Sequence, residues 1–118
     1  MNKSKEDKKV YDLRERLLLF AKRILEICKM LPNNPEGRRV RGQLGGAGTS
    51  IGANYEEADG SITKKDFVNK VVIARKEARE TRYWLRVISG LYVSEEDVTA
   101  DIKESQEIIN ILSSMVKK

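Results

Sequence analysis

The segment RRVRGQLGGAGTSIGANYEE, residues 38–57, decides the fold of this 118-residue chain. Residues 42–55 contain no charged side chain, although 35% of the whole chain is charged. Apolar residues recur through the segment at the steps of three and four that are typical of a helix with one buried face. The pattern predicts a helix over residues 35–58 whose buried face carries Val40, Leu44, Ala47, Ile51, Tyr55 and Ala58.

Glycines are unusually frequent in this predicted helix. Each interior glycine costs roughly 1 kcal/mol relative to alanine, so the five at positions 42, 45, 46, 48 and 52 together approach the net stability of a small domain. A phosphate-binding loop would need a preceding strand and a P-loop lysine, and the segment has neither. We therefore expect close packing against these small residues, much of it from a second subunit. The predicted oligomer interface consists of Gly42, Gly45, Gly46, Thr49, Gly52, Ala53 and Trp84.

Three further segments show the same helical periodicity, over residues 10–31, 63–90 and 94–116. The turns between them are short, and no stretch alternates in the manner of a β-strand. Asn34-Pro35 and Thr63 have the character of helix N-caps. The sequence predicts one all-α domain over residues 1–118, an antiparallel up-down four-helix bundle, with residues 1–9 as a disordered basic and polar N-terminus.

The composition argues against several classes of catalyst. Histidine is absent and Cys28 is the single cysteine, which removes the commonest general base, the commonest transition-metal ligand and any intrachain disulfide. Carboxylates in pairs can hold two metals in a helical bundle, but such bundles use Glu-x-x-His motifs. We predict no enzymatic activity, no catalytic residue, no metal and no cofactor. The alternative class is a metal-dependent enzyme, which a bound metal ion would indicate.

Polar residues flank the apolar seams of the second and third predicted helices. Buried polar groups need hydrogen-bond partners, so we expect these side chains to form a network that fixes the register of the helices. The predicted structural network consists of Arg41, Gln43, Ser50, Asn54, Glu57, Glu77 and Glu80.

Charge is distributed unevenly in this basic chain, whose formal net charge is +5. Residues 1–94 hold 20 Lys/Arg and 12 Asp/Glu, which gives +8, whereas residues 95–116 hold one lysine and six acids, which gives −5. Arginines follow each other at helical steps of four, three and four along one flank, and their forked guanidinium groups suit phosphate. They could equally pair with the acidic fourth helix. The candidate nucleic-acid-binding residues are Arg38, Arg39, Arg75, Arg79, Arg82 and Arg86.

The N-terminal residues 1–10 are charged and lack the apolar core of a secretory signal. No run approaches the roughly 18 apolar residues of a membrane-spanning helix. We expect a soluble, cytoplasmic protein without a membrane partner.

Ordered motifs give the chain a family resemblance over residues 10–115. The residues that carry it are Arg41-x-Gln43-Leu44-x-x-Ala47-x-x-Ser50-Ile51-x-x-Asn54-Tyr55-x-Glu57-Ala58, then Lys65-Asp66-Phe67, then Ala74-x-Lys76-Glu77-Ala78-x-Glu80-Thr81-x-Tyr83-Trp84-Leu85. They resemble the bacterial four-helix-bundle proteins encoded in intervening sequences of 23S rRNA genes, a family that includes the accessory variability determinants of diversity-generating retroelements. The chain departs from the commoner pattern at Tyr55 and Ala58, where relatives often have Ile and Gly.

This resemblance implies a four-helix protomer, assembly into a homopentamer and no known enzymatic activity. For the retroelement branch it also implies binding to nucleic acid and to a reverse transcriptase. Together with the charge pattern, it predicts an oligomer that binds RNA or DNA phosphates through its basic surface. The alternative is a protein–protein adapter that makes no direct contact with nucleic acid.

Overall fold

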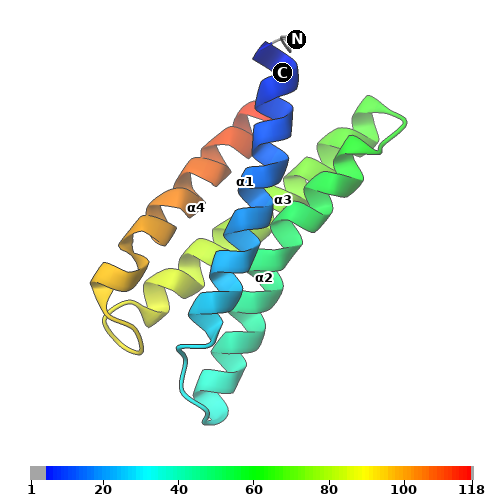
Figure 1. Cartoon of the computed structure of the whole chain (residues 1–118). Helices are drawn as coiled ribbons and strands as arrows, with labels where there is room; N and C mark the ends of the chain where they lie inside the picture. Colours follow the sequence, from blue (N-terminus) through cyan, green and yellow to red (C-terminus); the bar gives the residue numbers. More distant parts are fainter. Residues whose placement is uncertain (1–4, 118) are drawn as a thin grey trace.

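Four antiparallel helices make up the molecule (Figure 1). The computed structural model describes residues 5–117, with side chains from residue 13 onward. Within residues 5–117 there is no β-strand, so the predicted all-α four-helix fold is confirmed. No helix in this range is long and apolar enough to cross a membrane. The helices are α1 (Lys5–Cys28), α2 (Pro35–Asp59), α3 (Lys64–Ile88) and α4 (Glu95–Met115).

The helix boundaries follow from local capping. Asn34 accepts a 2.7 Å hydrogen bond from the backbone of Gly37, and Thr63 accepts a 3.1 Å bond from the backbone of Asp66. These bonds satisfy backbone donors that have no partner within a helix, as the sequence predicted for both positions. Helix α1 begins at Lys5, earlier than the expected start at residue 10, and the disorder expected for residues 1–9 falls in part on residues 1–4, which lie outside the described residues.

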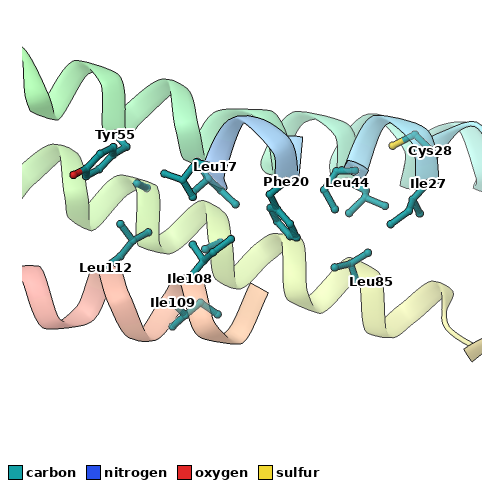
Figure 2. Close-up of a cluster of buried hydrophobic side chains, with 14 of the residues drawn as sticks. Leu17, Phe20, Ile27, Cys28, Leu44, Tyr55, Leu85, Ile108, Ile109 and Leu112 are labelled. Atoms are coloured by element: carbon teal, nitrogen blue, oxygen red, sulfur yellow. The ribbon is translucent and has the colours of Figure 1, made fainter. Parts of the chain in front are cut away.

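The core lies between the apolar seams of all four helices. Figure 2 shows Leu17 and Phe20 of α1 pointing into the same interior as Leu85 of α3 and Ile108 and Leu112 of α4. The predicted seam residues of α2 are all buried. Burial of these side chains supplies the main stabilisation of the fold.

Helix α2 packs against α1 on one side and α3 on the other, and α3 packs against α4. Helices α1 and α4 are joined by ion pairs: Nε of Arg16 lies 2.6 Å from an oxygen of Glu104, and Nε of Arg23 lies 3.1 Å from Oδ1 of Asp101. A further bond of 2.7 Å runs from Arg23 to the backbone oxygen of Asp97. Hydrogen bonding to Glu104 raises the pKa of Arg16 above its already high ordinary value. These ion pairs thus hold α4 against α1.

Some of the five glycines of α2, at positions 42, 45, 46, 48 and 52, face α1 of the same chain. A Cβ added at Gly48 would lie 2.6 Å from Cγ2 of Ile24, and one added at Gly52 would lie 3.5 Å from Cβ of Leu17. Gly45 similarly faces Cys28. Contact with α1 within the protomer thus accounts for part of the surroundings of Gly45 and Gly52, both of which remain partly exposed, and their place in an oligomer interface stays a prediction. A Cβ at Gly42 or Gly46 would meet no described atom within 4 Å.

Candidate nucleic-acid interface

Four arginines of α3 lie on one flank of that helix. Arg75 and Arg82 are half-buried, and Arg79 and Arg86 are exposed. Steps of four, three and four residues keep them on a single helical face. Because Arg79 and Arg82 line a groove together with side chains of α4, this flank is the one that faces α4. We call these four residues the arginine stripe.

The arginine stripe makes no ion pair with any of the side chains described, residues 13–117. The acids of α4 were the expected alternative partners. Glu104 and Glu107 instead bind Arg16, and Asp101 binds Arg23, all across the opposite flank of α4. Because Arg16 and Arg23 of α1 bind these three acids, the arginine stripe does not serve to pair with them.

The stripe also has unused hydrogen-bonding capacity. The Nε atoms of Arg75 and Arg82 are buried and have no hydrogen-bond partner within the described part of the chain. A guanidinium group carries five N–H donors and no acceptor. A buried donor without a partner is unfavourable by about 1–3 kcal/mol. Because these two Nε atoms are closed to solvent, an acceptor from outside would bind the other N–H groups of the stripe.

A polar groove of about 380 Å³ runs beside the stripe, between α3 and α4. Arg79 and Arg82 form one side, and the buried Ile109 lies among the α4 residues of the other. The sequence reasoning did not identify these α4 residues. Their spacing of four and three places them on one flank, but polar residues on a helix surface are too common for that spacing to be a signal. The remaining lining residues are Gln106, Asn110 and Ser113.

The two other candidate arginines lie apart from the stripe. Arg38 and Arg39 are exposed in the first turns of α2, and Arg38 donates a 3.2 Å hydrogen bond to Oδ1 of Asn33. Helix α2 packs against α1 and α3, whereas the stripe faces α4. The six arginines therefore come from two helices, Arg38 and Arg39 from α2 and the stripe from the flank of α3 that faces α4.

The polar residues that were expected to form one network have separate, mostly local roles. Arg41 donates to the backbone oxygens of Cys28 (3.3 Å) and Leu31 (3.1 Å), and so satisfies carbonyl groups at the end of α1. Ser50 donates to the backbone oxygen of Gly46 (2.6 Å). Asn54 donates to the backbone oxygen of Ser50 (2.8 Å). Short polar side chains in helices commonly bond the preceding turn in this way.

The three glutamates of the predicted network also differ from one another. Glu57 lies 2.8 Å from Nζ of Lys70 and ties α2 to α3. The carboxylates of Glu77 and Glu80 and the amide of Gln43 have no hydrogen-bond or ion-pair partner in the described part of the chain, although Thr81 donates a 2.8 Å bond to the backbone oxygen of Glu77. Burial, together with the charge of Glu80, raises the pKa of Glu77. A single connected network is thus not formed within the protomer.

Among residues 13–117, no group of three or more Cys, Asp or Glu side chains is arranged to hold a metal ion. Burial raises the pKa of the Cys28 thiol, which donates a weak hydrogen bond to the backbone oxygen of Arg41 (3.7 Å). A buried thiol with a raised pKa is inert as a nucleophile.

Comparison with known proteins connects these features to a family. The sequence matches the model of the 23S rRNA-intervening sequence protein family over residues 8–114. The chain belongs to this family. A similar solved structure is that of a protein of unknown function from the S23 ribosomal protein family of Bacteroides thetaiotaomicron, which is 39% identical with a TM-score of 0.81. The similarity covers 89% of this chain and 98% of that one. No curated protein matches the chain.

Membership of the 23S rRNA-intervening sequence protein family confirms the resemblance that the motifs of α2 and α3 indicated. It accounts for the four-helix fold.

One face of this family member is apolar and only partly covered. Leu18 and Leu25 of α1 are 47% and 48% exposed. They lie seven residues apart, hence on the same face of the helix. Leu18 lines a groove of about 370 Å³ between α1 and α2, where Ala21 of α1 meets small residues of α2. The α2 residues of this face that belong to the predicted interface are Thr49, Gly52 and Ala53.

The other predicted interface residues have mixed positions. Gly42 and Gly46 are exposed and have open space beside them. Trp84 is half-buried, packs against the core and meets Tyr83 edge-on, with ring centroids 5.2 Å apart. Trp84 therefore has a packing role within the protomer whether or not a second subunit covers it.

Proposed function

We propose that this chain is a non-enzymatic, homo-oligomeric four-helix bundle that binds the phosphates of RNA through the arginine stripe of α3. The observation that carries the proposal is that the arginine stripe is unpaired while acids of the neighbouring helix are paired elsewhere. Asp101, Glu104 and Glu107 of α4 are bound to Arg16 and Arg23 of α1. No ion pair joins the stripe to any acid among the described side chains, so the stripe keeps its positive charge. A row of such guanidinium groups attracts a polyanion.

The row of four guanidinium groups favours a chain of phosphates over a single anion. Guanidinium groups bind phosphate oxygens through two parallel hydrogen bonds. Arg75 and Arg86 are eleven residues apart, which is roughly 16 Å along a helix, a length that can contact more than one phosphate of a strand. A strand of regularly spaced phosphates matches this row. Arg38 and Arg39 would offer a second, separate contact to a longer RNA.

RNA is the first choice of nucleic acid because of the family to which the chain belongs, which is named for the intervening sequences of 23S rRNA. The same family resemblance supports an assembly of identical protomers. Leu18 and Leu25, beside the open Gly42 and Gly46, would form its contact surface. An oligomer would present several arginine stripes on one particle, and linked sites raise the overall affinity well above that of a single site.

A second candidate function is that of a protein–protein adapter. Val72 and Tyr83 of α3 are 39% and 59% exposed, and their spacing of eleven residues places them on one face. Such a face would suit a protein partner. A pull-down from nuclease-treated lysate separates the two functions. A protein partner that is retained without nucleic acid, and that is still retained when the arginines of the stripe are replaced, would support the adapter.

Titration of the full chain with a structured RNA at low salt tests the proposal. Replacement of Arg75, Arg79 and Arg86 by alanine should weaken binding by roughly tenfold or more, because each phosphate contact contributes to affinity. The matched control replaces Lys22, Lys65 and Lys76, which are exposed on other faces and carry the same total charge. Absence of binding by the unaltered protein, or equal loss in both triple variants, would contradict the proposal.

A further inference from the structure

We infer that the groove between α3 and α4 holds one unpaired nucleotide of an RNA. Its phosphate would bind Arg79 and Arg82, and the edge of its base would bind the side-chain amides of Gln106 and Asn110. The inference rests on the proposed function of the arginine stripe. It adds a site that reads the base, which phosphate binding alone would not require.

The lining of the groove is chemically divided between its two helices. Helix α3 contributes the two guanidinium groups of Arg79 and Arg82. Helix α4 contributes two carboxamides, the hydroxyl group of Ser113 and the buried Ile109. No carboxylate lines the groove. An anion that enters it therefore meets positive charge on one side and neutral hydrogen-bonding groups on the other.

The two carboxamides present a matched donor and acceptor. Nε2 of Gln106 donates a 3.0 Å hydrogen bond to Oδ1 of Asn110. This leaves Oε1 of Gln106 as an acceptor and Nδ2 of Asn110 as a donor. If both amides were turned over, one donor and one acceptor would still remain. The pair therefore always offers one of each.

A phosphate group alone would use only the donor of this pair and leave the acceptor unused, because its oxygens only accept hydrogen bonds from the protein. The edge of a nucleobase does use it, since bases carry donors and acceptors side by side, and Asn and Gln read such edges with two bonds. The groove thus combines a phosphate-binding side with a base-reading side. That combination indicates a nucleotide as the ligand.

The nucleotide must be unpaired. In an A-form RNA duplex the major groove is deep and narrow, so side chains cannot reach the base edges there. The shallow minor groove is recognised mainly through its shape, 2′-hydroxyl groups and phosphates rather than through its bases. Bases in loops and single strands are free to turn toward a protein. The volume of about 380 Å³ limits the site to about one nucleotide, and the remaining arginines of the stripe would follow the adjacent phosphates.

The test is a set of titrations of the full chain with ten-nucleotide oligomers of A, U and C, and with a fully paired hairpin. The key variant replaces Gln106 and Asn110 by alanine, and a second replaces Arg79 and Arg82. Gln43→Ala with Asn69→Ala is the matched amide control, since both side chains are exposed on other surfaces. Circular dichroism confirms that each variant is folded.

We expect the unaltered protein to prefer one single-stranded oligomer over the others and over the hairpin. Loss of Gln106 and Asn110 should reduce that preference by roughly tenfold while binding to the other oligomers persists. Loss of Arg79 and Arg82 should weaken every RNA alike, and the amide control should behave as the unaltered protein does.

The outcomes separate this inference from the proposed function. Equal affinity for all single strands, or a preference unchanged without the two amides, overturns the nucleotide site and leaves the arginine stripe as a phosphate-binding surface. Displacement of the RNA by a ten-residue glutamate peptide at equal concentration overturns it in favour of an acidic protein ligand. Absence of binding to any RNA contradicts the proposed function itself.

Discussion

Gly48 shows how closely α1 and α2 approach each other. A Cβ at this position would lie 2.6 Å from Cγ2 and 2.9 Å from Cβ of Ile24. Those atoms lie at the branch of the side chain, so they cannot move away without a backbone shift. Overpacking of this kind is unfavourable by about 1–3 kcal/mol, whereas the helix propensity of alanine returns about 1 kcal/mol. We expect Gly48→Ala to lower the free energy of unfolding by about 1 kcal/mol in urea denaturation.

A double-mutant cycle with Ile24→Ala checks that cause. The second substitution removes Cγ1 and Cγ2 of Ile24, two of the three atoms that the added methyl group would meet, so the two losses should sum to more than the loss in the double variant. Strict additivity would show that Gly48 matters for a reason other than its contact with Ile24.

Glu77 should make the stability of the protein depend on pH. Burial, and then the charge of Glu80, raises its pKa above the ordinary value of 4.5. The folded state therefore prefers the protonated form: stability is greatest below the unfolded pKa and is lost as the pH rises through the folded pKa. Glu77→Gln should raise the melting temperature at pH about 8 and leave it nearly unchanged at pH about 3.

Glu15→Gln is the control for this prediction, because Glu15 is an exposed carboxylate on α1. It should show no gain in melting temperature at the higher pH. A gain of the same size in both variants would mean that net charge, rather than the surroundings of Glu77, sets the effect.

At the scale of single residues, the sequence predicted which side chains are buried better than it predicted which groups those residues contact. The seam of α2 and the caps at Asn34 and Thr63 follow from periodicity and local hydrogen bonding, and the structure has them where they were expected. The glycine positions were visible too, but periodicity cannot say which backbone approaches a small residue. At Gly52 the neighbouring backbone is that of Leu17 in α1, whereas at Gly45 the neighbours are side chains of α1.

At the scale of the helices, the ion pairs between α1 and α4 determine which charges remain available. Asp101 is 8% exposed, and its partner Arg23 has a side chain that is 39% exposed. Asp101→Ala should lower the free energy of unfolding by about 1–2 kcal/mol, because water replaces only part of the lost pair. Thermal unfolding measures the loss.

Glu107→Ala is the matched comparison, since Glu107 pairs with Arg16 from a more exposed position of 48%. Exposed pairs contribute about 0–1 kcal/mol, so its loss should be the smaller one. Equal losses in the two variants would contradict a special role for the buried carboxylate.

Charge pairing at this scale could not be predicted from the sequence. The periodicity places the acids of α4 on one flank, but α4 has two neighbours, α1 and α3. The arginine stripe of α3 was the more conspicuous candidate, whereas the acids bind Arg16 and Arg23 of α1. The α4 side of the groove could not be predicted for a similar reason. Gln106 and Asn110 line a groove only because α3 lies opposite them, and periodicity does not show which helix lies opposite.

At the scale of the whole molecule, the fold and the family followed from the sequence, and the assembly is a prediction. Leu18→Glu with Leu25→Glu should reduce the particle mass measured by light scattering, because charges would enter the apolar face beside α2. Leu19→Glu is the control: Leu19 is 61% exposed but lies about 100° around α1 from Leu18. An unaltered protein with the mass of one protomer would contradict the oligomer.

The salt dependence of RNA binding tests the central claim, phosphate binding by the arginine stripe, most directly. For the unaltered protein, the logarithm of the binding constant should fall linearly with the logarithm of salt concentration. Each lost contact to single-stranded RNA reduces the slope by roughly 0.7, so the variant without Arg75, Arg79 and Arg86 should have a slope shallower by roughly 2. Identical slopes for the two proteins, or binding insensitive to salt, would contradict the account.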